Sequence, residues 1–330
     1  MGLMSTVRWG IAGPGRMAEV FVKDFGHVPD AELVAVGSRS LERAQVFADE
    51  HGIARAHGSY ADLCADPEVD VVYIATPHPQ HKAIALAAIA AGKGVVVEKA
   101  FTATLAGATE VVEAARAAEV FCMEGMWTRF QPVVRRMHEI VDAGEIGTLT
   151  AVMGDLFAHR EFVPDDRLFD PAKGGGSMLD LGVYVTHFAQ DFLGNPSEVQ
   201  TRGRLYENGV DAQVALLLDH ASGAQASLMA ALQAPGPGRQ VVIGTGGWIE
   251  VEPRFHHPRA IIVHRNGRED ERIELEPEGL GYAHEIAEVT RCIQQGLTES
   301  PLLPLDDTLS VMATMEQGLS QLGVSYTEAD

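Results

Sequence analysis

A glycine-rich turn near the amino end of the chain constrains its fold more than any other feature. The apolar residues 7–12 predict a buried strand that runs directly into a G-x-G-x-x-A pattern formed by Gly13, Gly15 and Ala18. Gly13 can adopt the positive φ of a tight turn, and Gly15 has no Cβ to keep a ligand from the backbone. A helix predicted over residues 16–26 presents its first amides and its dipole to a pyrophosphate. Strand, turn and helix in this order indicate a dinucleotide-binding βα unit.

Strands and helices alternate through the first 125 residues. We expect strands at 32–37, 55–57, 69–75, 94–98 and 120–124, and helices at 40–50, 59–64, 79–91 and 104–118. Several of these strands are continuous apolar runs, which is typical of a parallel sheet covered on both faces. Right-handed crossovers make such a sheet doubly wound, with its ligand site at the carboxyl ends of the strands. The sequence therefore predicts an α/β Rossmann domain over residues 1–125.

The pattern changes after Gly125. We expect helices at 130–143, 174–193, 281–296 and 306–322, a long strand at 148–157, and short alternating strands between about 197 and 275. Asn208-Gly209 and Asn266-Gly267 are hairpin signals. Residues 126–330 are thus predicted to form an α+β domain for substrate binding and oligomerisation, with a large, mostly antiparallel open sheet and a last helix able to pack back on the first domain. A free, half-apolar sheet face favours a homodimer or homotetramer.

Composition narrows the choice of partners. Lys and Arg number 25 against 46 Asp and Glu, a net charge of −21, which argues against nucleic acid or an anionic membrane. The longest apolar run, residues 83–91, is too short to cross a bilayer, and the amino end has no signal-like segment. Cys64, Cys122 and Cys292 are odd in number and form no C-x-x-C pair, which indicates a reduced, cytoplasmic location. A small-molecule partner is expected.

The end of the second predicted strand carries Ser38 and Arg39, with Arg43 one turn later. Sites that prefer NAD place an acid here to hold the ribose 2′-hydroxyl. A carboxylate would repel a 2′-phosphate, whereas a guanidinium and a hydroxyl bind it, so we expect NADP, with NAD as the alternative. The two arginines could also be ordinary solvated residues at a helix start. In so acidic a chain, their occurrence at one turn favours the phosphate interpretation.

Two histidines follow the buried strand at 69–75. Thr76, Pro77, His78 and His81 lie where the chain leaves this strand. The histidines suggest a metal, but no Cys or carboxylate accompanies them at ligand spacing, so no metal is predicted. We expect a loop that lines the cofactor cleft, with Thr76 and Pro77 near the nicotinamide.

Three side chains have the chemistry of proton transfer. Lys99 leaves a buried strand at the carboxyl edge of the sheet, where an ammonium can hold a substrate hydroxyl or lower the pKa of a neighbouring acid. If a helix begins near Ser177, Asp180 and Tyr184 share one face, with His187 near them. A phenol beside an ammonium suits acid–base work on an alcohol. The alternatives are a surface lysine, an aspartate that caps a helix or forms a salt bridge, and a half-buried core tyrosine.

Taken together, residues 10–18, Glu98-Lys99-Ala100 and the stretch from Gly175 to Tyr184 resemble the Gfo/Idh/MocA oxidoreductase family, and the likeness covers essentially the whole chain. Ser38, Arg39, Arg43 and the segments 126–130 and 167–171 are similar to the branch that holds dimeric dihydrodiol dehydrogenase and NADP-dependent D-xylose dehydrogenase. The resemblance implies a Rossmann domain followed by an open-sheet domain, with Lys99 and Tyr184 as the catalytic pair and Asp180 nearby. The expected cofactor-binding residues are Gly13, Gly15, Arg16, Met17, Ser38, Arg39, Arg43, Thr76, Pro77, His81, Glu98, Lys99, Trp127 and Arg167.

The chain departs from the family pattern at two places. The family usually has Glu-Lys-Pro, often with a cis proline, whereas this chain has Ala100, so the geometry of the bond before Ala100 stays open. Inositol-specific members carry a histidine at the position of Tyr184 and an aspartate at that of His187, which argues against an inositol substrate.

The predicted function is hydride transfer between NADP(H) and a CH–OH group of a sugar, polyol or vicinal diol. Tyr184 would take or give the hydroxyl proton, Lys99 would keep it acidic and Asp180 would orient the substrate, with Arg129, Arg160 and Arg167 as rim residues. One alternative is an enzyme that retains its cofactor and acts on glycosides by oxidation, elimination and reduction. Another is an NADP-binding regulator without catalysis.

Overall fold

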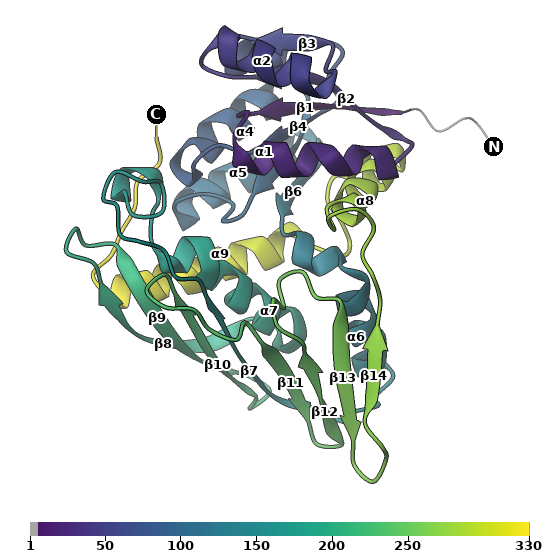
Figure 1. Ribbon diagram of the computed structural model, residues 1–330, viewed down its shortest axis with the longest axis vertical. Coiled ribbons are helices and arrows are strands. Elements are labelled where there is room, and N and C mark those ends of the chain that lie inside the picture. Colours follow the sequence, from purple (N-terminus) through teal and green to yellow (C-terminus); the bar gives the residue numbers. More distant parts are fainter. Residues whose placement is uncertain (1–5, 330) are drawn as a thin grey trace. The chain divides into compact units, whose positions relative to one another are not determined.

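The computed structural model describes residues 6–329, and they divide into two compact units (Figure 1). The first unit comprises 6–126, 278–308 and 328–329, and the second comprises 127–277 and 309–327. Both units are therefore discontinuous along the chain. The segment 278–308, which the sequence analysis assigned to the second domain, belongs to the first unit. The functional boundary near residue 125 stays a prediction.

The first unit is built on a six-stranded sheet whose order is β3-β2-β1-β4-β5-β6. Every neighbouring pair in it is parallel, which confirms the predicted doubly wound topology. Trp9, Ile11, Val36 and Tyr73 are fully buried on these strands, as expected for a sheet covered on both faces. The strands are β1 (Val7–Ala12), β2 (Ala31–Gly37), β3 (Arg55–His57), β4 (Val71–Ile74), β5 (Gly94–Glu98) and β6 (Cys122–Gly125).

Short helices cover this sheet. They are α1 (Arg16–Phe21), η1 (Val22–His27), α2 (Leu41–His51), α3 (Tyr60–Ala65), η2 (His78–Gln80), α4 (His81–Ala90), α5 (Leu105–Ala118) and α8 (Ala283–Gln294). The helix predicted over 16–26 is α-helical only to Phe21 and then tightens into the 3₁₀ turn η1. Within η1 the buried Asp24 accepts hydrogen bonds from the backbone N–H groups of Leu280, Tyr282 and Ala283. That carboxylate anchors the start of α8, a segment distant in sequence, to the first unit.

The second unit contains an eight-stranded sheet of order β14-β13-β12-β11-β7-β10-β9-β8. Its neighbouring pairs are antiparallel except β10 and β7, which run parallel, so the prediction of a large, mostly antiparallel sheet is confirmed. The strands are β7 (Leu149–Phe157), β8 (Pro196–Leu205), β9 (Asp211–His220), β10 (Gln225–Ala231), β11 (Gln240–Gly244), β12 (Gly247–Val251), β13 (Ala260–Arg265) and β14 (Glu271–Glu274). The helical segments are η3 (Trp127–Phe130), α6 (Pro132–Asp142), η4 (Pro171–Lys173), a π-turn η5 (Met178–Gly182) and α7 (Val183–Leu193), and α9 (Leu305–Gln321) enters this unit after its first turn.

The two faces of the eight-stranded sheet differ in burial. Helix α7 packs against β7 and β10, and alternate residues of the sheet such as Val152 and Leu228 are fully buried. Intervening residues point to the other face, where Met153, Leu217 and Trp248 are 47, 39 and 41% exposed. This second face therefore exposes large apolar side chains.

Among residues 6–329, no helix combines the length and the apolar composition needed to span a bilayer. The cysteines Cys64, Cys122 and Cys292 are all buried and unpaired with one another. The cytoplasmic location stays a prediction.

Candidate functional site

The glycine turn of the first unit has the geometry that a close ligand requires. Gly13 has a φ of +97°, and its N–H donates to the carbonyl of Gly37 at 3.0 Å. A Cβ on Gly13 would lie 2.9 Å from the Thr76 side chain, so the turn tolerates only glycine. A Cβ on Gly15 would meet nothing within 4 Å, so the backbone there borders open space. Gly15 is the N-cap of α1, and no side chain caps the helix, which leaves its first amides to a ligand.

Two arginines gather at the end of β2. Ser40 caps α2 by accepting a hydrogen bond from the Arg43 N–H, and both Arg39 and Arg43 are exposed. Burial raises the pKa of Tyr60, while the charges of Arg39 and Arg43 act in the opposite direction. Both guanidinium groups therefore act electrostatically on the Tyr60 hydroxyl. Sequence reasoning missed Tyr60, because nothing local marks it as a neighbour of the β2 turn.

The loop after β4 is fastened to the segment after β5 by His81. This side chain is fully buried, and its Nδ1 lies 3.2 Å from the carbonyl oxygens of both Ala100 and Phe101. Its Nε2 lies 2.7 Å from the Thr76 carbonyl oxygen. The His81 ring thus contacts the backbone of the loop after β4 through one nitrogen and the backbone of the segment after β5 through the other. Pro77 follows Thr76 in the first of these segments. Thr76 Oγ1 is buried and has no hydrogen-bond partner in the described part of the chain, so it suits a polar ligand group.

His, Cys, Asp and Glu side chains that could bind a metal come close together at one place in the described residues. Within residues 6–329, the one group of three ligand atoms close enough to share an ion is Glu19, Glu50 and His51. His51 Nε2 lies 2.9 Å from Glu19, as an ordinary ion pair would. The group contains neither His78 nor His81.

Lys99 follows β5 directly and is half-buried. The Lys99–Ala100 peptide bond is cis, which answers the question that Ala100 left open. Glu98 is buried, and its two oxygens accept hydrogen bonds from the Tyr73 hydroxyl at 2.5 Å and the Lys99 N–H at 3.2 Å. The Glu98 carboxylate is thus hydrogen-bonded to groups of the protein. These positions at the carboxyl edge of the sheet, with the open space beside Gly15 and the orphan hydroxyl of Thr76, fit a dinucleotide.

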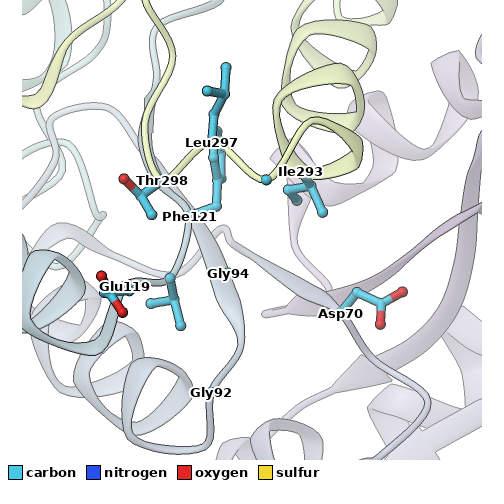
Figure 2. Close-up of a pocket in the computed structure, with 10 residues that line it drawn as sticks. Asp70, Gly92, Gly94, Glu119, Phe121, Ile293, Leu297 and Thr298 are labelled. Atoms are coloured by element: carbon cyan, nitrogen blue, oxygen red, sulfur yellow. The ribbon is translucent and has the colours of Figure 1, made fainter. Parts of the chain in front are cut away.

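A pocket of about 240 Å³ lies at the opposite edge of this sheet, where β4, β5 and β6 begin (Figure 2). Phe121, Ile293 and Leu297 form its apolar lining, and Asp70 lies at its rim. The Asp70 carboxylate is already paired with a neighbouring arginine at 2.8 Å. A ligand of a doubly wound sheet binds at the carboxyl ends of the strands, so this pocket is not the cofactor crevice.

In the second unit, a buried aspartate shapes the turn before α7. Asp211 accepts hydrogen bonds from Ser177 Oγ at 2.7 Å and from the Met178 N–H at 2.6 Å, and Tyr326 Oη lies 3.2 Å away. Burial raises the pKa of Asp211 to about 6. A Cβ on Gly176, whose φ is +121°, would strike the Asp211 carboxylate. Sequence reasoning missed Asp211, although an acid next to the apolar run of β9 was the available signal.

Asp180 and Tyr184 occupy different helical turns from those expected. The prediction assumed one α-helix from about Ser177, whereas η5 is a π-turn that contains Asp180 and ends where α7 begins. Because a π-turn is wider than an α-turn, Asp180 and Tyr184 do not have the i, i+4 spacing of an α-helix. The hydrogen bond from Ser177 to Asp211 fixes the residue that precedes this π-turn. Asp180 pairs with Arg167 at 3.0 Å. Asp180 is therefore part of an ion pair, as the structural alternative had anticipated.

The Tyr184 hydroxyl accepts a hydrogen bond from Trp127 Nε1 at 3.2 Å, and both residues are 8% exposed. The ring of His256 lies 5.2 Å from that of Tyr184, and the ring of His257 lies 5.4 Å from that of Trp127. Thr128 Oγ1 donates to the His256 carbonyl at 2.6 Å and so fixes this loop. Burial lowers the pKa of His257, which favours its neutral form. Trp127 and His256 thus contact the tyrosine on which the acid–base prediction rests, and His257 packs behind them.

Two other residues named in the sequence analysis, His187 and Arg129, pack against neighbouring side chains of the second unit. Burial lowers the pKa of His187 to about 3, so its imidazole stays neutral. Arg129 Nη1 lies 2.6 Å from Asp191, which His138 also contacts at 2.8 Å. The Arg129 side chain is 11% exposed. This buried ion pair corrects the expectation that Arg129 lies on an open rim, whereas Arg160 is exposed.

Comparison with known proteins supports the same fold. Residues 7–126 match the oxidoreductase family with an NAD-binding Rossmann fold, and residues 134–250 match the GFO/IDH/MocA C-terminal domain. Trans-1,2-dihydrobenzene-1,2-diol dehydrogenase from Xenopus laevis is 35% identical over 97% of this chain and 99% of that protein. The human protein of the same name is 32% identical over 98% of both chains. A crystal structure of aldose-aldose oxidoreductase from Caulobacter crescentus has a TM-score of 0.87 at 24% identity, over 96% of this chain and 98% of that one.

The chain belongs to the Gfo/Idh/MocA oxidoreductase family. It is an NAD(P)-dependent dehydrogenase with a nucleotide-binding Rossmann domain. The family membership predicted from the glycine turn, Lys99 and Tyr184 is therefore confirmed, and the regulator without catalysis is set aside.

Proposed function

We propose that this dehydrogenase uses NADP and oxidises a vicinal diol or a sugar at a CH–OH group. The observation that carries the proposal is the Tyr184 hydroxyl, which accepts a hydrogen bond from Trp127, with the ring of His256 beside Tyr184 and that of His257 beside Trp127. A phenol in this position can exchange a proton with an alcohol, and the flat rings around it favour a cyclic substrate. The dihydrodiol dehydrogenases, similar over nearly the full length, support a vicinal diol.

The preference for NADP rests on the end of β2. Arg39, Arg43 and Ser38 would hold the 2′-phosphate, and the charges of both arginines act on the Tyr60 hydroxyl. Gly13, Gly15, Arg16 and Met17 would hold the pyrophosphate, and Thr76, Pro77, His81, Glu98, Lys99, Trp127 and Arg167 complete the proposed set of cofactor-binding residues. When bound, NADP supplies the hydride acceptor for the carbon that carries the hydroxyl.

In the proposed reaction, Tyr184 takes the hydroxyl proton while the substrate carbon loses hydride, and the reverse direction returns both. Trp127 donates to the phenol oxygen, so it stabilises the phenolate form. The role that the family resemblance implies for the Lys99 ammonium is to hold the substrate oxygen, and Asp180 would orient a second hydroxyl. No metal takes part in this proposal.

The test compares variants with matched controls. Lys99→Met and Tyr184→Phe should each reduce kcat by about a hundredfold while NADPH still binds. Lys93→Met removes a lysine just before β5, and Tyr206→Phe removes a hydroxyl from the second unit, so both should keep their activity. Full turnover by Tyr184→Phe would overturn the assignment. A panel of trans-diols and sugars, assayed with NADP and NAD, identifies the substrate class.

The glycoside alternative makes a different prediction in the same assay. Oxidation followed by elimination and re-reduction returns the cofactor to its starting state, so no net NADPH accumulates. Net NADPH formation that matches product formation supports the dehydrogenase.

We also propose a homodimer or homotetramer in which a second copy covers the outer face of the eight-stranded sheet. Met153, Leu217 and Trp248 are exposed there, and Val241 is paired with Met153 across β11 and β7. Exposed large apolar side chains on a sheet face are typical of an interface between identical chains.

A further inference from the structure

The segment that carries Lys99 is held by two buried carboxyl groups. Glu98 Oε2 accepts from the Lys99 N–H at 3.2 Å, and Glu124 Oε1 accepts from the Phe101 N–H at 3.1 Å. The two donors lie on either side of Ala100. The other oxygen of Glu124 accepts from Thr308 Oγ1 at 3.2 Å. Glu124 thus ties β6 to the segment after β5 and to the first turn of α9.

These carboxyl groups belong to a crowded buried cluster. Glu98 is 5% exposed, and Glu124 and Glu285 are fully buried. The charges of Glu98 and Glu124 act on Glu285, and those of Glu98 and Lys99 act on Glu124. Neither oxygen of Glu285 has a hydrogen-bond partner among residues 6–329. Several carboxylates cannot all ionise in so small a volume of low dielectric, so at least one of them carries a proton at neutral pH.

The hydrogen bonds of the three carboxyl groups indicate which of them carries the proton. Glu98 accepts hydrogen bonds from the Tyr73 hydroxyl and the Lys99 N–H, and Glu124 accepts hydrogen bonds from the Phe101 N–H and the Thr308 hydroxyl. Glu285 accepts none, so it has the least stabilisation for a negative charge. The proton therefore stays on Glu285, and Glu124 is the next group to take one up.

We propose that Glu124 is a positioning residue whose protonation state sets how firmly the Lys99–Phe101 segment is held, and with it the activity of the enzyme. The proposal rests on the proposed catalytic role of Lys99. As a carboxylate, Glu124 gives the Phe101 N–H a charge-assisted hydrogen bond and supplies a counter-charge for Lys99. As a neutral acid, after taking a proton from solvent, it gives a weaker bond and no counter-charge.

The surroundings of Glu124 bring its change of protonation to near-neutral pH. Burial raises the pKa of Glu124 to about 7, against the opposing effect of its bonds to Thr308 and Phe101. Burial and the charges of Glu98 and Glu124 raise the pKa of Glu285 well above its ordinary value, so Glu285 stays neutral while Glu124 titrates. The firm hold on the segment is therefore present above about pH 7 and is lost as the pH falls through that value.

The activity test uses kcat/KM for the preferred diol or sugar at saturating NADP across the neutral range. Wild-type enzyme should show an inflection near pH 7. Glu124→Gln should lose that inflection and stay at the acid level, about fivefold below wild type at about pH 8. Thr308→Val removes one donor and should move the inflection upward by about half a pH unit. Glu285→Met, a substitution in the same cluster at a group that stays neutral, should leave the inflection in place.

A second measurement does not depend on turnover. In protein labelled with ¹⁵N-phenylalanine, the Phe101 amide shift should titrate near pH 7 in the wild type and at a somewhat higher pH in Lys99→Met, where the counter-charge is lost, but not in Glu124→Gln. A flat Phe101 shift in the wild type, or an inflection that survives in Glu124→Gln, would overturn the role of Glu124. If the Phe101 amide titrates in Lys99→Met while that variant keeps full activity, the proposed catalytic role of Lys99 fails and the protonation of Glu124 stands.

Discussion

Replacing the buried carboxyl of Glu285 with methionine should make the first unit more stable, and the gain should grow with pH. Glu285 lies in the first turn of α8, fully buried, with no hydrogen-bond partner for either oxygen in the described chain. Burial, with the charges of Glu98 and Glu124, raises its pKa well above the ordinary 4.5. Methionine is of similar size and needs no hydrogen bond.

The sign and size follow from proton linkage. In the unfolded chain Glu285 ionises above about pH 4.5, whereas in the folded chain it must keep its proton. The raised pKa therefore has no effect on stability below about pH 4.5, where both states keep the proton, and it destabilises the fold increasingly as the pH rises above that value. Each pH unit lowers the free energy of unfolding by about 1.4 kcal/mol until the folded pKa is reached. The advantage of Glu285→Met should therefore grow with pH at this slope once the pH passes about 5.5.

Urea unfolding at several pH values measures this advantage. Trp9 is fully buried and packs against Phe21, so its fluorescence reports the first unit when Trp127 and Trp248 are replaced by phenylalanine. The control is Glu42→Gln, an exposed glutamate in the first turn of α2, which should change stability by less than about 0.5 kcal/mol. An advantage of Glu285→Met that stays constant with pH would refute the reasoning, because it would mean that Glu285 is ionised in the fold.

Three further predictions concern other parts of the molecule. Arg39→Glu should raise the KM for NADP by about tenfold or more and leave the KM for NAD nearly unchanged, and an unaltered KM for NADP would count against a 2′-phosphate site at the end of β2. Asp24→Ala should lower the thermal stability of the first unit by about 2 kcal/mol, because three amides at the start of α8 lose their buried acceptor; calorimetry measures this, with the exposed Asp30→Ala as control. Met153→Glu should dissociate the oligomer in sedimentation velocity, and a wild-type protein that sediments as a monomer would contradict the interface proposed on the outer sheet face.

Local patterns in the sequence were sufficient for the type of fold. The glycines at 13 and 15, the apolar strands and the capped helices identified a parallel Rossmann sheet, and the Asn-Gly turns identified the antiparallel one. Family membership followed from Lys99 and Tyr184 in their motifs. These features depend on neighbours within a few residues, whose periodicity and turn chemistry can be read along the chain.

The tertiary structure decided what long-range partners determine. The assignment of α8 to the first unit follows from the contact of Asp24 with residues some 250 positions later, and the π-turn at Asp180 begins where Asp211 holds Ser177. The proton on Glu285 depends on burial beside two other carboxyl groups from separate strands. Sequence separation hides such contacts, because burial and electrostatic neighbours arise only when distant segments pack together.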